Sequence, residues 1–381
     1  MKVLFDMAYI VEPEPAGVKI YGFELVTNMA KYYPDVKLAV IGMAAQEDYI
    51  RSSIKGEIVY IPVNDDVRQW AHHAQNHYMG VRKWKEHDAR TFEQIAEYDV
   101  CVTSFANGPL IDFSQYIRHI GVIHDLQGQA IAWAQKKSWD TVRSIFRSWQ
   151  KYRRLHAIVA ISNATKAQVD RFCFRNSTLI YNSITHMDYM AEKPKDFPAD
   201  FDDYILDVNS FFRYKNAKTL IQAFCMIKDY YPQLKLYFKG NNNPDYESLL
   251  TMVQELGIEN RVKFDREFRS SEEMAWLYQN AKLFVSPSLM EGFGYTPLEA
   301  ILNKVPTIVS DIKTLREVTR GCATLFNPYS AEELASLVKN HLESQFTDEE
   351  LDKRADYIRQ YYSSENQVRK FMDVIEETVN R

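Results

Sequence analysis

The chain has 381 residues, of which 46% are hydrophobic and 25% charged. This composition is typical of globular proteins and excludes a disordered, collagenous or low-complexity chain, and the length is sufficient for two domains or slightly more. With 46 basic and 51 acidic residues the net charge is −5, which argues against a general nucleic-acid-binding protein. The four cysteines are widely separated and form no CxxC pair. We therefore expect no disulfide framework, no zinc finger and a reducing compartment.

The N-terminal residues MKVLFDMAYI are typical of a β-strand and lack the long apolar stretch of a signal peptide. No apolar run in the sequence reaches the ~18 residues that a membrane-spanning helix requires. We therefore expect a cytoplasmic protein, with contact to the inner face of the membrane left open.

Short β-rich runs alternate with longer segments of helical periodicity along the whole chain, for example 215–231 and 331–343. This alternation predicts an α/β protein with parallel sheets that are covered by helices on both faces. The expected strands are 2–10, 36–43, 58–63, 99–104, 119–125, 157–162, 178–182, 204–209, 234–240, 261–265, 283–288, 307–311 and 323–327.

An acidic segment with two prolines, residues 191–203, interrupts the pattern and is interpreted as a linker. It contains Asp200-Phe-Asp202, which has the form of a metal-binding DxD motif but is interpreted as part of a solvated acidic stretch. The predicted organisation is an N-terminal Rossmann-like domain (1–190), the linker, and a C-terminal Rossmann-like domain (204–360). The terminal helix, 361–381, is expected to pack back toward the N-terminal domain.

The segment around Glu291 is the most informative part of the sequence. A buried strand ends at Pro287, a loop with two glycines follows, and a helix is then expected to begin, with Thr296 as N-cap, Pro297 first and Glu299 completing a capping box. The loop would present free backbone N–H groups at the positive end of a helix. From local chemistry, Glu291 and Glu299 either bind ligand hydroxyls or, in the case of Glu299, only cap the helix.

The sequence EGFGYTPLEA resembles the Glu-x7-Glu signature of the retaining glycosyltransferases of family 4, which have the GT-B fold of two Rossmann-like domains facing a cleft. The resemblance implies that Glu291 and its loop bind the donor sugar and that Glu299 binds the ribose of the nucleotide. One departure is Asn303-Lys304, where a glycine usually precedes the Val-Pro pair; we expect it to alter a turn and not the chemistry. The donor-binding residues that the resemblance implies are Gly17, Gly292, Phe293, Gly294, Tyr295, Thr296 and Glu299.

The C-terminal half opens with a strand and a loop that carries Arg213, Lys215 and Asn216. This loop is similar to the family's first C-terminal strand and loop, whose arginine and lysine hold the donor diphosphate. Fixed cations there would stabilise the negative charge that builds up on the leaving phosphate. The arginine is two residues before the lysine here, closer than in many family members. The alternative is that Arg213 and Lys215 are solvated loop charges.

Two residues of the N-terminal half complete the candidate site. Gly17 lies between the first strand and the first helix and resembles the family's glycine loop, where a missing side chain lets the diphosphate and the acceptor approach the backbone. His124 ends a strand and matches a family histidine that contacts the donor sugar or the acceptor. The alternatives are an ordinary turn glycine and a structural histidine oriented by Asp125.

The resemblance implies a retaining glycosyltransferase that moves a sugar from a UDP- or GDP-sugar to a glycan or lipid-linked glycan, without a metal ion or other cofactor. A dinucleotide-dependent oxidoreductase or epimerase is disfavoured because the first strand is followed by no GxGxxG. An inactive GT-B binding protein is the third reading. Segment 133–156 has an aromatic and a basic stripe at helical spacing, which predicts either peripheral membrane contact or a helix packed on the sheet.

Overall fold

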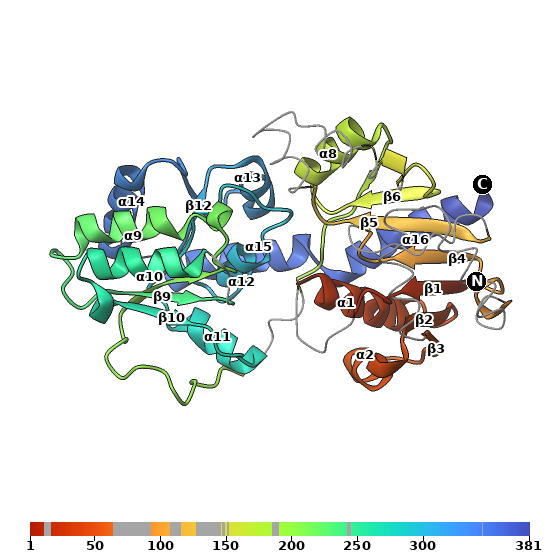
Figure 1. Ribbon diagram of the computed structural model, residues 1–381, viewed down its shortest axis with the longest axis horizontal. Coiled ribbons are helices and arrows are strands. Elements are labelled where there is room, and N and C mark those ends of the chain that lie inside the picture. Colours follow the sequence, from red (N-terminus) through yellow and green to blue (C-terminus); the bar gives the residue numbers. More distant parts are fainter. Residues whose placement is uncertain are drawn as a thin grey trace. The chain divides into compact units, whose positions relative to one another are not determined.

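The computed structural model of the protein describes residues 1–10, 17–63, 93–106, 116–126, 146, 149–150, 152–184, 190–241, 245–344 and 346–381. Within these residues the chain forms two compact units. One consists of Met1–Ser183 with Ser364–Arg381, and the other of Ile184–Ser363. Each unit is built on its own parallel sheet (Figure 1). The expected α/β class with two Rossmann-like parallel sheets is confirmed.

The first unit has a parallel sheet whose order, among the described residues, is β3-β2-β1-β4-β5-β6-β7. Its central strands are buried almost throughout, as expected for a parallel sheet with both faces covered. The strands are β1 (Lys2–Asp6), β2 (Lys37–Met43), β3 (Val59–Val63), β4 (Val100–Thr103), β5 (Arg118–Ile123), β6 (Ala157–Ala160) and β7 (Thr178–Leu179).

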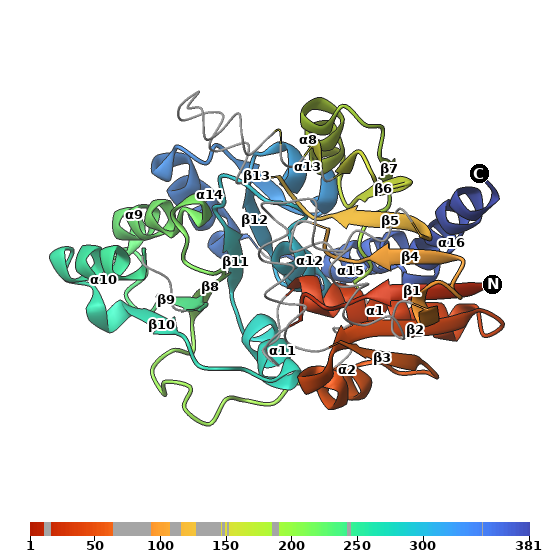
Figure 2. The ribbon, with the colours of Figure 1, turned by 45° about the vertical axis from the view of Figure 1, so that its right-hand side comes forward.

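The helices described in this unit are α1 (Gly17–Tyr32), α2 (Glu47–Ser53), α8 (Asn163–Cys173) and α16 (Ser364–Asn380), with a 3-10 turn at Ala44–Gln46. Ser162 caps α8, since its side chain accepts a hydrogen bond from the backbone N–H of Thr165 at 3.1 Å. Helix α16 comes from the far end of the chain and contacts α1, β4 and β5 (Figures 1 and 2). The first unit therefore contains both chain termini.

The second unit has a parallel sheet with the order β10-β9-β8-β11-β12-β13. Its strands are β8 (Tyr204–Val208), β9 (Lys235–Lys239), β10 (Val262–Asp265), β11 (Leu283–Ser286), β12 (Thr307–Ser310) and β13 (Thr324–Phe326). Its helices are α9 (Ala217–Ile227), α10 (Tyr246–Glu255), α11 (Ser271–Gln279), α12 (Tyr295–Leu302), α13 (Lys313–Thr319), α14 (Ala331–Glu343) and α15 (Asp348–Tyr361), with 3-10 turns at Arg213–Lys215 and Glu259–Arg261.

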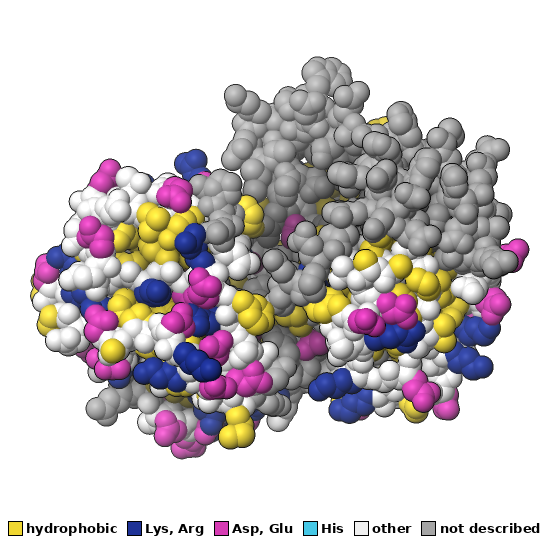
Figure 3. Space-filling model, turned by 60° about the horizontal axis from the view of Figure 1, so that its bottom comes forward, with side chains coloured by type: hydrophobic (Ala, Val, Ile, Leu, Met, Phe, Trp, Pro, Cys, Tyr) yellow, Lys and Arg dark blue, Asp and Glu magenta, His cyan; other side chains and the backbone are white. Residues whose placement is uncertain are grey.

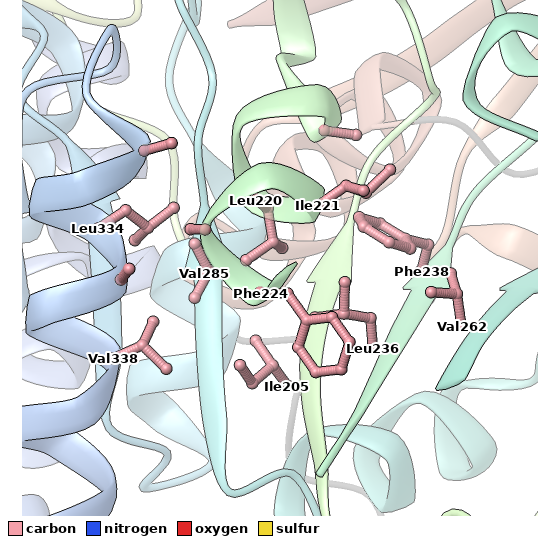
Figure 4. Close-up of a cluster of buried hydrophobic side chains, with 14 of the residues drawn as sticks. Ile205, Leu220, Ile221, Phe224, Leu236, Phe238, Val262, Val285, Leu334 and Val338 are labelled. Carbon is pink, nitrogen blue, oxygen red and sulfur yellow. The ribbon is translucent and has the colours of Figure 1, made fainter. Parts of the chain in front are cut away.

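One face of this sheet is covered by α9 and α14 (Figure 4). Leu220 and Phe224 of α9 pack on Ile205 and Leu236 of the central strands, and all four are at most 1% exposed. Burying such a side chain stabilises the fold by roughly 1.5–3 kcal/mol. This core fixes the central strands from which the loops of the candidate site extend.

The opposite face is covered by an aromatic cluster that includes the expected linker. Phe197 and Phe201 of segment 191–203 are 8% and 6% exposed, and they pack with Tyr204 and Tyr237. Asp200 of this segment also forms an ion pair with Lys235, at 3.1 Å. The phenylalanines thus hold this segment on the second unit, which begins at Ile184. The interpretation of the segment as a linker stays a prediction.

Basic and acidic side chains are interspersed over the described residues on the face shown in Figure 3. Such a mixture agrees with the slightly negative net charge. Within the described ranges, no helix is both long and apolar enough to cross a bilayer.

Candidate functional site

The strand order of the second unit places a topological switch point between β8 and β11. The chain runs outward from β8 through β9 to β10 and then returns to the other side of β8 with β11. Ligands of open α/β sheets bind outside the carboxyl ends of the strands at such a point. The loop after β8 carries Arg213 and Lys215, and the loop after β11 carries Glu291. The fold thus brings the two predicted motifs to one place.

Lys215 and Glu291 form an ion pair at this switch point. Lys215 Nζ donates to Glu291 Oε1 at 2.7 Å and to Oε2 at 2.9 Å, and the two side chains are only 17% and 12% exposed. Burial alone would lower the pKa of Lys215, but the charge and hydrogen bonds of Glu291 raise it above the ordinary value. Lys215 is therefore a fixed cation and not a solvated loop charge.

The backbone around Lys215 is held by its neighbour Asn216. Asn216 adopts a left-handed conformation with φ of 59°, and its side-chain amide donates to Pro287 O at 3.0 Å and Pro328 O at 2.9 Å. These bonds tie the loop after β8 to the end of β11 and to the loop after β13. The position of Lys215 therefore depends on three strand ends.

A third charged residue, Asp207 near the end of β8, was not found from the sequence. Its side chain is 2% exposed and accepts a hydrogen bond from Asn209 Nδ2 at 2.7 Å. Burial raises the pKa of Asp207 to about 7; the Asn209 bond and Lys215 lower it, and Glu291 raises it further. The signal in the sequence is a single carboxylate that interrupts the apolar strand Tyr204–Val208.

Helix α12 does not begin where the sequence predicts. Gly294 is its N-cap, in a left-handed conformation with φ of 95°, and the helix starts at Tyr295. Thr296 and Pro297 are thus its second and third residues. A proline is tolerated in the first turn because the N–H groups there have no partner within the helix. The predicted Thr296 cap with a Glu299 capping box is wrong. The loop Gly292, Phe293 and Gly294 still leads into the positive end of the helix.

Glu299 is the fifth residue of α12 and has a different partner. Its Oε2 accepts a hydrogen bond from the Tyr278 hydroxyl of α11 at 2.7 Å. Burial and the charge of Glu299 together raise the pKa of Tyr278 well above its ordinary value, so the hydroxyl stays a donor. Tyr278 was also missed from the sequence, because only the packing of α11 against α12 brings the two residues together. Glu299 is oriented by this bond and does not cap its helix.

Arg213 lies in the same loop as Lys215 but in a different setting. Its backbone N–H donates to Asp245 Oδ2 at 2.9 Å, and its side chain is exposed. The structure therefore fixes the backbone at Arg213 and leaves its guanidinium at the surface. A role for Arg213 toward a diphosphate stays a prediction.

The two candidate residues of the first unit are Gly17 and His124. Gly17 is the first residue of α1, and its preceding segment 11–16 is outside the described residues. The order β3-β2-β1-β4 gives this unit its own switch point between β1 and β4, so Gly17 follows one of its two strands.

His124 follows β5 and is 6% exposed. Its Nε2 lies 2.8 Å from the carbonyl oxygen of Ser104, and because a carbonyl only accepts, Nε2 carries a proton. Its ring meets the ring of Tyr21 edge-on at 4.8 Å. Burial lowers the pKa of His124 to about 4, so the ring is neutral at physiological pH. These are contacts that a structural histidine makes, and contact with a sugar stays a prediction.

Most of segment 133–156 is outside the described residues. Of its aromatic stripe, Phe146 and Trp149 stack at 5.4 Å, while Tyr152 is 2% exposed and packs in the core of the first unit. Tyr152 therefore supports helix-on-sheet packing at the end of the segment.

Comparison with known proteins identifies the second unit. Residues 190–361 match the family model of glycosyl transferases group 1. This segment, a little under half of the chain, is thus similar to the glycosyl transferases of group 1. Its span covers Lys215, Glu291 and Glu299 but not the two candidate residues of the first unit, Gly17 and His124.

Curated relatives with similar sequences include two mannosyltransferases. The O-antigen chain mannosyltransferase RfbU of Salmonella typhimurium is 33% identical over 164 residues, 43% of each chain. The serotype-specific mannosyltransferase WbdA of Escherichia coli is 27% identical over 207 residues, 50% of this chain and 25% of WbdA. The match thus spans less than half of either relative.

Solved structures resemble the chain over nearly its full length. Anabaena Alr3699/HepE, solved in complex with UDP-glucose, gives a TM-score of 0.71 at 19% identity and covers 99% of this chain and 100% of its own. Sucrose-phosphate synthase from Thermosynechococcus elongatus gives a TM-score of 0.71 at 16% identity, with 99% and 98% covered. These likenesses confirm the GT-B fold that the sequence predicts.

Proposed function

We propose that this protein is a glycosyltransferase that moves mannose from a nucleoside diphosphate to a glycan or lipid-linked glycan in surface polysaccharide assembly. The observation that carries the proposal is the Lys215–Glu291 pair at the switch point, beside the N-terminus of α12. The group 1 match and the mannosyltransferase relatives support sugar transfer and point to mannose as the sugar.

The Lys215–Glu291 pair suits a donor that carries a diphosphate. An ammonium has three N–H donors, and at most two of those of Lys215 are used by Glu291. The remaining donor and the N–H groups of the first turn of α12 would bind phosphate oxygens. Glu291 accepts from sugar hydroxyls with its other lone pairs, and Glu299, held by Tyr278, accepts from the ribose hydroxyls.

In the proposed reaction the bond between the anomeric carbon and the phosphate oxygen breaks, and the electron pair leaves with the diphosphate. Lys215 and the helix dipole stabilise the charge that develops there, an effect of about 3–4 kcal/mol for one well-placed donor. The acceptor hydroxyl attacks from the face that the leaving group vacates and passes its proton to a diphosphate oxygen. The products are a glycoside with retained configuration and a nucleoside diphosphate.

The acceptor is assigned to the first unit, with Gly17 and His124 as candidate contacts. Arg213 is assigned to the diphosphate because its backbone is fixed two residues before Lys215. No metal ion is assigned, since Lys215 and the start of α12 supply the positive charge. We expect the protein to work in the cytoplasm, where a lipid-linked acceptor would lie at the inner face of the membrane.

The test is to incubate the protein with a panel of sugar nucleotides, including GDP-mannose and UDP-glucose, and to measure release of the nucleoside diphosphate. We expect slow hydrolysis of one donor, faster with an acceptor glycan present. Lys215→Ala should reduce turnover about a hundredfold or more, whereas Lys218→Ala, an exposed charge on the adjacent helix, should not. Binding without turnover would favour an inactive binding protein instead.

A further inference from the structure

Lys239 is a buried cation at the carboxyl end of β9 that the proposed reaction does not use. It is 7% exposed, and within the described part of the chain its Nζ takes part in no hydrogen bond or ion pair. Desolvation lowers the pKa of Lys239, and the charge of Asp265 only partly counteracts this. An ammonium that loses most of its contact with water and gains no hydrogen-bond partner is destabilised.

The nearest acid, Asp265, is already engaged. It is the register partner of Lys239 on β10, and its Oδ2 accepts from Tyr237 OH at 2.8 Å and from Arg269 Nε at 2.7 Å. Helix α11 begins just beyond, capped by Ser270, and its positive end adds to the cost of an unpaired cation there. Within the described part of the chain, Lys239 therefore has no hydrogen-bond acceptor of its own.

Lys239 lies on the same face of the sheet as the residues that hold Glu299. Side chains alternate along a strand, so Lys239 shares a face with Tyr237, which belongs to the cluster that contains Tyr278 and Ala300. Only β8 separates β9 from β11, the strand whose loop leads into α12, a distance of about 10 Å at two strand spacings. Lys239 and the helices that carry Tyr278 and Glu299 therefore lie on one face of the sheet.

A nucleotide sugar is a linear molecule in the order sugar, diphosphate, ribose, base. With the diphosphate at Lys215 and the ribose at Glu299, the base continues along this face, away from the sugar and toward the ends of β9 and β10. We propose that Lys239 donates a hydrogen bond to a keto oxygen of the base, O6 of guanine or O4 of uracil. The inference rests on the proposed function and adds to it a basis for donor choice.

A lysine at this position discriminates between bases by hydrogen-bond polarity. Guanine and uracil present a carbonyl acceptor there, whereas adenine and cytosine present an amino group that can only donate. A donor facing a donor leaves both buried groups unpaired, which costs about 1–3 kcal/mol or more. Lys239 therefore selects GDP- and UDP-sugars against ADP- and CDP-sugars.

The experiment is calorimetric binding of GDP, UDP, ADP and CDP to the full chain and to Lys239→Met. The parent should prefer GDP or UDP. The variant should bind these two at least tenfold more weakly and ADP and CDP within twofold of the parent. The control is Lys282→Met, which removes the same charge at the amino edge of the sheet, where Lys282 is 55% exposed. It should match the parent for all four.

Equal weakening for all four nucleotides would show a phosphate contact and overturn the proposal, as would unchanged binding. A parent that binds none of them overturns the proposed function as well, so the two failures are distinguishable. The melting temperature of unliganded Lys239→Met should equal or exceed that of the parent, since an unpaired buried charge is removed. A large fall in melting temperature would indicate a structural lysine, and Lys239→Arg, which like lysine can only donate, should then retain the base preference if the proposal holds.

Discussion

Glu299 and Tyr278 show how one hydrogen bond decides between two roles for a residue. A glutamate in the first turns of a helix is commonly a cap, but Glu299 is the fifth residue of α12 and bonds to a buried tyrosine of α11. A carboxylate that is oriented by a buried donor keeps its remaining lone pairs in fixed directions. Ribose recognition is the role that this arrangement favours.

We predict that Glu299→Gln weakens nucleoside diphosphate binding at least tenfold, about 1.4 kcal/mol, because an amide accepts fewer hydrogen bonds than a carboxylate. Tyr278→Phe should weaken it by a smaller factor, since Glu299 stays but loses its orienting partner. Isothermal titration calorimetry measures both. The control is Glu247→Gln, at an exposed position on α10. If Glu299→Gln bound the nucleotide as tightly as the parent, the proposed contact between Glu299 and the ribose would be contradicted.

Asp207 makes the stability of the protein depend on pH in a defined direction. Its folded pKa of about 7 lies above the ordinary 3.8, so the folded state binds more protons than the unfolded state between these values. The contribution of Asp207 to stability therefore falls as pH rises from about 4 to about 7 and stays low above that. Asp207→Asn removes this dependence and can still accept the Asn209 bond.

We predict that the unfolding free energy of Asp207→Asn, relative to the parent, increases by about 2–3 kcal/mol between pH 5 and pH 8, at about 1.4 kcal/mol per pKa unit. Urea denaturation of the full chain at the two pH values measures this. A difference that stays constant with pH would mean that Asp207 is ionised at both.

At the scale of elements, the start of α12 depends on a glycine. Gly294 has φ of 95°, and a Cβ added there would lie 2.7 Å from Leu315 Cδ2. We predict that Gly294→Ala destabilises the protein by about 1–3 kcal/mol or more through strain and steric overlap, and also weakens nucleotide binding because the first N–H groups of α12 move.

The matched control is Gly257→Ala. Gly257 also has a positive φ, 62°, but a Cβ there would meet nothing within 4 Å. Gly257→Ala should therefore lose only the stability that a positive φ costs an alanine, and it should leave nucleotide binding unchanged. If the two variants lost equal stability and bound nucleotide equally, the overlap with Leu315 would be of no consequence.

Strand positions follow from the sequence because local apolar runs determine them. Each expected strand is found among the described residues, and the expected helix 331–343 coincides with α14. The expected strands are often longer than the observed ones, as at 2–10, where β1 ends at Asp6. The chain turns there because the Asp6 side chain accepts a hydrogen bond from Ala8 N at 3.0 Å.

Features that depend on tertiary contacts do not follow from the sequence in the same way. The observed start of α12 differs from the predicted one because Gly294, and not Thr296, takes the cap position. Lys304, where the resemblance to the family would place a glycine, adopts φ of 60°, a left-handed conformation that favours glycine. Asp207, Tyr278 and Lys239 acquire their environments only when strands and helices pack.

At the scale of the whole molecule, each unit presents a switch point of its own. In the second unit it carries the charged residues Lys215 and Glu291, and in the first it carries Gly17. This division agrees with a donor held by one unit and an acceptor served by the other, as proposed above.

In the proposed site Lys215 and the start of α12 supply the positive charge that the diphosphate requires, so we predict that transfer activity is unchanged by EDTA. The measurement compares initial rates with and without chelator, and with Mg²⁺ or Mn²⁺ added back. A complete loss that either metal restores would show that the protein residues do not neutralise the diphosphate alone.

The measurement that tests the central claim most directly is NMR of the product formed from GDP-α-mannose and a glycan acceptor. The anomeric one-bond carbon–proton coupling reports the configuration of the new linkage. The proposed site, with Lys215 on the leaving diphosphate and attack on the same face, predicts an α-mannoside together with free GDP. A β-mannoside would contradict the proposed mechanism.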